Sequence, residues 1–153
     1  MTTIRTVAII GAGQMGSGIA QTVATGGYEV RLYDLSAERI PLAQGEIAAS
    51  LARRAARGLM TQAEADAALA RIQPATSLKE AAKADLVIEA ASEDEAVKKS
   101  VFIELTPHLG PDTLLASNTS SISITRLASV TDRPDRFIGL HFMKPAPTMK
   151  LVE

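Results

Sequence analysis

The stretch Gly11-Ala12-Gly13-Gln14-Met15-Gly16 constrains the fold most, because of the segments on either side of it. The run before it, over 4–10, is rich in β-branched residues and is typical of a buried parallel strand. After it, apolar residues recur at helical spacing over 14–25, and a second apolar run over 28–33 is followed by Asp34. This order of strand, glycine turn, helix, strand and acid predicts a βαβ unit that binds a dinucleotide.

Each residue type in this unit has its own physical role. Gly11 permits the tight turn, Gly13 lets the backbone approach a pyrophosphate, and Gly16 lets helix and strand pack closely. The free N–H groups at the start of the helix favour phosphate binding. Asp34 is suited to accept hydrogen bonds from a ribose hydroxyl and to repel a 2′-phosphate, which favours NAD over NADP. The alternative is a glycine-rich turn that binds no ligand.

The composition excludes several classes of function. The chain has 153 residues, enough for one domain with a sizeable core. Its net charge of −1 and its 3% of aromatic residues argue against nucleic acid as a partner. It has no cysteine, which removes disulfides, thiol nucleophiles and the usual zinc ligands of dehydrogenases, and we expect no metal. The N-terminal apolar run is too short for a signal peptide or a membrane span, so we expect a cytoplasmic protein.

Strands and helices alternate along the chain, which predicts a doubly wound, mostly parallel α/β sheet of the Rossmann type. A long helical pair is inserted after the second strand. Ser36 is the expected N-cap of its first helix and Gly58 the residue that ends it, while Thr61 and Glu64 form a capping box that begins its second helix. The further predicted elements are helices over 37–57, 61–71 and 95–109 and strands over 73–75, 85–90, 113–116, 137–142 and 149–152.

Hydride transfer to a nicotinamide requires a base that takes the hydroxyl proton, and the chain has two histidines. His108 lies in the last turn of a predicted surface helix, where a solvated role is expected. His141 ends an apolar strand at the edge of the sheet where ligands bind. If the run 149–152 pairs beside that strand, the Glu153 carboxylate meets the imidazole, fixes its tautomer and favours its protonated form.

Further polar residues follow the other predicted strands at the same edge. Asn118 and Ser120 lie in a Ser-Asn-Thr-Ser-Ser segment and are candidates for binding the reacting oxygen. An ordinary strand-to-loop turn is the alternative, since these residue types favour turns. The short-chain dehydrogenase class is excluded, because neither Tyr28 nor Tyr33 has a lysine four residues on. The Gly-Lys-Ser/Thr of a triphosphate-binding loop is also absent.

Four segments together resemble the NAD-binding domain of the L-3-hydroxyacyl-CoA dehydrogenase family, and most closely its bacterial 3-hydroxybutyryl-CoA members. These segments are 11–21, 117–121, 139–143 with Pro145, and 149–153. The resemblance implies that His141 is the general acid/base, that Glu153 orients it, and that Ser120 and Asn118 lie near the substrate oxygen. It also implies cofactor contacts by Gly11, Ala12, Gly13, Gln14, Met15, Gly16, Asp34, Glu93, Lys98, Ser120 and Lys144.

The same resemblance implies that Ser50, Arg57 and Ser120 contact the CoA substrate, although a solvated basic face over Arg53, Arg54 and Arg57 is an alternative for the helix. Lys144 departs from the family, which usually has an asparagine there near the nicotinamide. Family members also continue into an all-helical domain that supplies the dimer interface and part of the acyl-CoA pocket. We therefore expect residues 1–153 to be one NAD-binding domain of a homodimeric enzyme, with an apolar patch near residue 153.

The leading hypothesis is an NAD-dependent oxidoreductase of fatty acid metabolism (β-oxidation). It would interconvert (S)-3-hydroxyacyl-CoA and 3-oxoacyl-CoA, with short acyl chains favoured. Two alternatives remain open at this point. One is an NAD-binding module with no catalysis of its own, and the other is a related dehydrogenase that acts on a free hydroxy acid or sugar acid.

Overall fold

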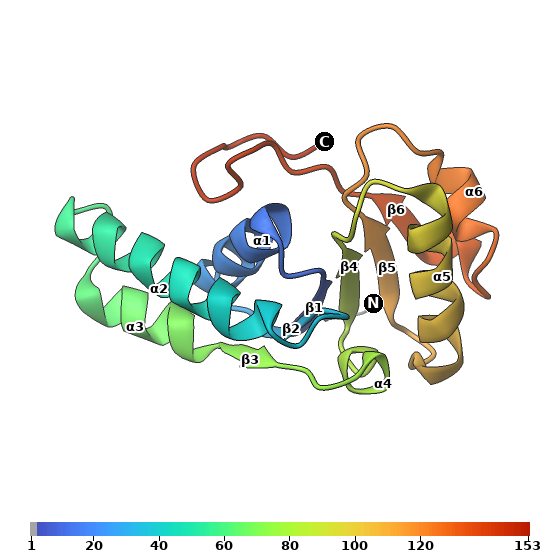
Figure 1. Cartoon of the computed structure of the whole chain (residues 1–153), viewed down its shortest axis with the longest axis horizontal. Helices are drawn as coiled ribbons and strands as arrows, with labels where there is room; N and C mark the ends of the chain where they lie inside the picture. Colours follow the sequence, from blue (N-terminus) through green and yellow to red (C-terminus); the bar gives the residue numbers. More distant parts are fainter. Residues whose placement is uncertain (1–2) are drawn as a thin grey trace.

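Six parallel strands, in the order β3-β2-β1-β4-β5-β6, form the centre of the computed structural model, which describes residues 3–153 (Figure 1). The order reverses between β1 and β4, as in the predicted doubly wound sheet of the Rossmann type. The carboxyl ends of all six strands therefore meet at one edge. The strands are β1 Thr6–Ile10, β2 Glu29–Tyr33, β3 Ile72–Pro74, β4 Leu86–Glu89, β5 Leu114–Ser117 and β6 Phe137–Gly139.

Helices cover both faces of the sheet, and Figure 1 shows α1, α2 and α3 on one side and α4, α5 and α6 on the other. Side chains of a strand alternate between the faces, so Ile9 packs under the first group of helices while Ala8 packs under the second. On the second face, Phe102 and Phe137 meet edge to face with ring centroids 4.7 Å apart. The helices are α1 Gln14–Thr25, α2 Arg39–Ala56, α3 Gln62–Ala70, α4 Leu78–Ala81, α5 Glu95–Leu105 and α6 Ile124–Ala128.

Two of the three predictions for the termini of the helical pair α2–α3 are confirmed. The side chain of Thr61 accepts from the N–H of Glu64 and the Glu64 side chain accepts from the N–H of Thr61, which confirms the capping box. Gly58 has φ +73° and its N–H donates to the carbonyl of Ala55, so it ends α2 as predicted. The prediction for Ser36 is wrong. Its carbonyl accepts from the N–H of Arg39 in a tight turn, and α2 begins after that turn with no side-chain cap.

The remaining differences from the predicted elements are local. The strand predicted over 137–142 ends at Gly139, so His141 lies in the segment just after β6. The helix predicted over 95–109 ends at Leu105 and continues as a 3-10 turn, η1 Thr106–His108, whose His108 is exposed. The strand predicted over 149–152 is a single antiparallel bridge between Val152 and Phe142. The helices α4 and α6 and a 3-10 turn, η2 Pro134–Arg136, were not predicted. Within residues 3–153, no helix combines the length and apolarity that crossing a membrane requires.

Candidate functional site

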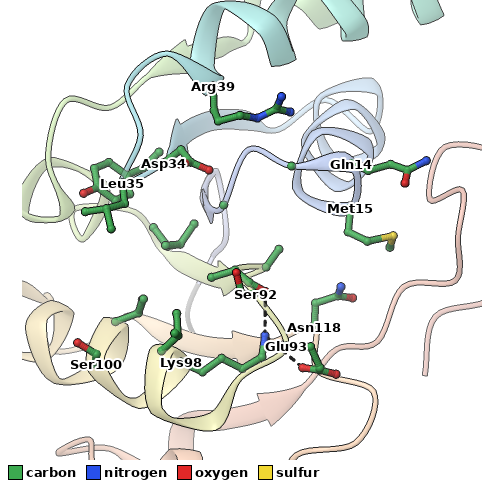
Figure 2. Close-up of a pocket in the computed structure, with 18 of the residues that line it drawn as sticks. Gln14, Met15, Asp34, Leu35, Arg39, Ser92, Glu93, Lys98, Ser100 and Asn118 are labelled. Atoms are coloured by element: carbon green, nitrogen blue, oxygen red, sulfur yellow. Dashed lines mark hydrogen bonds and ion pairs between the residues drawn. The ribbon is translucent and has the colours of Figure 1, made fainter.

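A pocket of about 1240 Å³ opens at the carboxyl ends of the strands (Figure 2). This volume exceeds the roughly 300–1,000 Å³ of an ordinary small-molecule site. Residues from the ends of five strands line it, which brings together most of the site residues predicted from the sequence. Those in its wall are Gly11, Gly13, Gln14, Met15, Asp34, Glu93, Lys98, Asn118, Ser120, His141 and Lys144.

The glycine turn has the close backbone approaches expected of it. Gly11 has φ +112°, and a Cβ there would lie 2.4 Å from the carbonyl oxygen of Ala90. A Cβ on Gly16 would lie 1.7 Å from the carbonyl oxygen of Gly11, so only glycine allows α1 to start this close to β1. A Cβ on Gly13 would meet nothing within 4 Å, and this open position lines the pocket. The turn is therefore tight on its protein side and unobstructed on its pocket side.

Asp34 and Arg39 bind the backbone of Ala12 in this turn, one at its N–H and the other at its carbonyl. The Asp34 Oδ2 accepts from the N–H of Ala12 at 2.8 Å, and its Oδ1 accepts from the N–H of Ser36 at 2.8 Å. The Arg39 Nη2 donates to the carbonyl oxygen of Ala12 at 2.8 Å. Sequence reasoning missed Arg39. An arginine at the start of the helix that follows Asp34 was the signal available.

A buried ion pair supports the other end of the pocket. The Lys98 Nζ lies 2.7 Å from the Glu89 Oε2, and both side chains are almost fully buried. Glu89 also accepts from the Ser117 hydroxyl and from the N–H of Ala91, so its carboxylate joins the ends of β4 and β5. Sequence reasoning gave Glu89 no role. The signal was its position in an apolar strand, because a buried carboxylate requires a partner of opposite charge.

Glu93 fixes the loop that carries Ser120. Its Oε1 accepts from the Thr119 hydroxyl at 2.8 Å, and its Oε2 accepts from both the N–H and the hydroxyl of Ser120 at 2.9 Å. The Lys98 Nζ lies 3.5 Å away. Partial burial alone would raise the pKa of Glu93, but these hydrogen bonds and the lysine charge lower it to about 2. Because the Ser120 hydroxyl donates to Glu93, its oxygen lone pairs are left for a ligand.

Asn118 connects the ends of β5 and β6. Its Oδ1 accepts from the N–H of Phe142 at 2.8 Å, and its own N–H donates to the carbonyl of Glu89. The amide oxygen is thus occupied by the backbone, and the amide nitrogen is the group that can donate to a ligand. Asn118 and Ser120 are therefore both held by contacts with other loops at this edge of the sheet.

His141 and Glu153 meet as the sequence predicted. The His141 Nδ1 lies 3.3 Å from the Glu153 Oε2. Their backbones exchange two hydrogen bonds: the N–H of His141 donates to the carbonyl of Glu153 at 2.8 Å, and the N–H of Glu153 donates to the carbonyl of His141 at 2.9 Å. The carboxylate is thereby held at Nδ1, which leaves Nε2 as the ring nitrogen available for proton transfer.

The structure does not bring every candidate residue to the pocket. Ser50 lies on α2 and Arg57 at its C-terminal end, and neither lines the pocket wall. Ala12 and Gly16 are buried behind the turn rather than in the wall. Lys144 is exposed at the rim, in the segment that follows His141. Within residues 3–153, no group of three or more acidic or histidine side chains is placed to hold a metal ion.

Comparison with protein families and sequences gives consistent matches over the whole chain. Residues 6–153 match the family described as 3-hydroxyacyl-CoA dehydrogenase, NAD binding domain. The chain is 51% identical over 150 residues to a 3-hydroxybutyryl-CoA dehydrogenase of Bradyrhizobium diazoefficiens, covering 98% of this chain and 51% of the relative. It is 50% identical over 153 residues to a 3-hydroxyadipyl-CoA dehydrogenase of Escherichia coli, covering 100% of this chain and 32% of the relative.

Comparison with solved structures agrees. The crystal structure of a 3-hydroxybutyryl-CoA dehydrogenase from Escherichia coli superposes with a TM-score of 0.95 at 49% identity, covering 99% of this chain and 32% of that one. The chain therefore spans about half or less of the length of these relatives.

Proposed function

The chain belongs to the family of 3-hydroxyacyl-CoA dehydrogenase NAD-binding domains, and on that basis we propose that it provides the cofactor site and the acid–base pair of such an enzyme. The enzyme interconverts (S)-3-hydroxyacyl-CoA and 3-oxoacyl-CoA, with short acyl chains preferred. The observation that carries the proposal is the pairing of His141 with Glu153 in the wall of the pocket that the glycine turn also lines.

The residues of the pocket suit NAD. The open face at Gly13 admits a pyrophosphate, and Asp34 presents a carboxylate to a ribose hydroxyl while repelling a 2′-phosphate. Gln14 and Met15 add the first turn of α1 to the same wall. At the other end, Glu93, Lys98 and Lys144 border the space for the nicotinamide. When bound, the nicotinamide supplies the hydride acceptor or donor.

His141 moves the proton of the reaction. During oxidation its Nε2 takes the proton of the substrate hydroxyl, and during reduction it returns that proton to the carbonyl oxygen. Glu153 at Nδ1 keeps the ring in the required tautomer and stabilises the imidazolium that forms. The Asn118 amide nitrogen donates to the substrate oxygen as negative charge develops there, and the Ser120 hydroxyl rotates from Glu93 to donate to the same oxygen.

The remainder of the substrate site lies on a second, helical domain, which also forms the interface of a homodimer. Two observations support this part of the proposal. The chain spans about half or less of the length of its relatives. In addition, the apolar side chains of Met149, Leu151 and Val152 are exposed, a few residues after the segment 141–144 that lines the pocket. Ser50 and Arg57 on α2 contact the CoA portion. We place the enzyme in the cytoplasm, in fatty acid β-oxidation.

The test is the substitution His141→Gln in the complete enzyme, with acetoacetyl-CoA and NADH as substrates. Loss of a general acid/base lowers kcat by about 10²–10⁴-fold, while the Kd for NADH changes little. His108→Gln, at an exposed histidine outside the pocket, is the matched control and retains full activity. Turnover that survives His141→Gln would exclude this histidine as the acid/base.

Two other outcomes would favour the alternative functions. NADH binding without turnover by the wild-type enzyme would favour a binding module. Reduction of free acetoacetate as fast as its CoA ester would favour a free-acid substrate.

A further inference from the structure

Within residues 3–153, two carboxylates contact the buried side chain of Lys98. Its Nζ lies 2.7 Å from the Glu89 Oε2 and 3.5 Å from the Glu93 Oε1, and only 2% of the side chain is exposed. The first distance is that of a charge-assisted hydrogen bond, and the second is longer than such a bond. Glu89 therefore neutralises most of the lysine charge, although Glu93 lies within reach of it (Figure 2).

The Glu89 carboxylate is itself fixed by its surroundings. Its Oε1 accepts from the Ser117 hydroxyl, and its Oε2 accepts from the N–H of Ala91 at 2.7 Å as well as from the lysine. The side chain is fully buried at the end of β4 and does not line the pocket. Any influence of Glu89 on the reaction therefore passes through the groups that it holds.

Glu93 holds the loop after β5. It accepts from the Thr119 hydroxyl and from both the N–H and the hydroxyl of Ser120. Burial raises the pKa of Glu93, the hydrogen bonds from Ser120 and Thr119 lower it, and the charge of Lys98 contributes least to the lowering. The bond from the Ser120 N–H keeps the backbone in place when the hydroxyl turns towards a ligand. Glu93 thus serves the loop more than it serves the lysine.

We propose that Glu89 is a positioning residue for Ser120. It acts by taking the charge of Lys98, which would otherwise engage Glu93. The inference rests on the proposed function, since it concerns how a group that contacts the substrate oxygen is held. Without the charge of Glu89, a buried lysine attracts Glu93 strongly, because water screens little there. Glu93 is then drawn out of its hydrogen bonds with the loop, and Ser120 loses its fixed position.

The first measurement is kcat of the complete enzyme with acetoacetyl-CoA and NADH. We expect Glu89→Gln to lower kcat by about tenfold to a hundredfold, up to the lower end of the 10²–10³-fold that deletion of a donor to an oxyanion costs. Arg133→Gln is the matched control. Arg133 is also a buried charged residue, but it donates to the carbonyls of Gly110 and Thr113, which precede β5, so its loss leaves kcat of the folded enzyme unchanged.

The second measurement separates positioning from a merely structural role. Deuterium exchange of the Ser120 N–H, followed by NMR on the 153-residue chain, reports whether Glu93 still holds the loop. We expect Glu89→Gln to accelerate this exchange about tenfold. The double variant Glu89→Gln/Lys98→Met restores the slow exchange, because no lysine then competes for Glu93. A second deletion would not restore a residue needed only for packing.

Several outcomes would overturn the inference. They are unchanged kcat or unchanged exchange in Glu89→Gln, an equal loss of kcat in Arg133→Gln, and fast exchange in the double variant. Absence of turnover by the wild-type enzyme would instead contradict the proposed function, and the exchange of the Ser120 N–H then decides the role of Glu89. If Glu89→Gln does not fold, the double variant decides it, since it leaves no unpaired buried charge. Slow exchange there supports the inference.

Discussion

At the scale of single residues, Glu93 couples the stability of the site to pH. The pKa of its carboxyl is lowered from 4.5 to about 2 in the folded chain, so above 4.5 the ionised group favours folding. As the pH falls from 4.5 towards 2, the unfolded chain takes up the proton first and this contribution is lost. We expect wild type to be more stable than Glu93→Gln at neutral pH and the difference to shrink through that range. Urea denaturation at a series of pH values measures it, and a constant difference would contradict the assignment.

Two glycines of the turn separate folding from binding. Gly16→Ala places a Cβ against the carbonyl oxygen of Gly11 and is expected to lower the free energy of unfolding by about 3 kcal/mol. Gly13→Ala meets no protein atom within 4 Å, so it changes stability by about 1 kcal/mol at most. It nevertheless weakens NADH binding about tenfold, because the methyl group stands where the pyrophosphate approaches. Chemical denaturation and calorimetry distinguish the two effects, and normal NADH affinity in Gly13→Ala would refute the second.

Residues with local signatures were predictable from the sequence, whereas residues defined by distant partners were not. The glycine turn and Asp34 follow a fixed spacing around one strand and one helix, so they could be placed in advance. His141 and Glu153 each follow an apolar run, and only the pairing of those runs was a hypothesis. Arg39 and Glu89 gain their roles from contacts across the fold, with Ala12 and with Lys98, so the local sequence marks their positions without naming their partners.

At the scale of elements, the helical pair gives a direct comparison of two caps. Thr61 accepts from the N–H of Glu64, and Thr61→Ala is expected to lower the free energy of unfolding by about 1 kcal/mol. Ser36 has the residue type of an N-cap, but α2 starts after it without a side-chain cap. Ser36→Ala should therefore cost less than about 0.5 kcal/mol. Urea denaturation of both variants provides the measurement, and equal costs would mean that Ser36 does cap α2.

The long helices were predicted well because their apolar periodicity extends over several turns, and the central strands because they are continuous apolar runs. The helices α1 and α2 and the strands β1 and β4 lie within two residues of their predicted bounds. The helices α4 and α6 have four and five residues, too few for a helical period to be recognised. The segment 149–152 has the apolar residues of a strand, but the structure gives it one bridge to Phe142 rather than a ladder.

At the scale of the whole molecule, the exposed apolar residues near the C-terminus have a consequence in solution. Met149, Leu151 and Val152 are 45%, 55% and 42% exposed, although each is apolar. We expect the 153-residue chain to associate weakly through them, because apolar surface of this kind favours contact over hydration. Leu151→Lys should reduce the association, whereas Leu59→Lys, at an exposed leucine beyond the end of α2, should not. Sedimentation velocity over a range of protein concentration tests this, and equal behaviour of the two variants would contradict it.

The two backbone hydrogen bonds between His141 and Glu153 close the base of a loop over 142–152. The tip of this loop is held as well, because Ala146 is buried in the core and a Cβ on Gly18 of α1 would lie 3.2 Å from the Cδ of Pro147. Closed at its base and packed at its tip, the loop ties the register of the histidine and the carboxylate to α1. An insertion at this tip would therefore disturb the pairing that the chemistry requires.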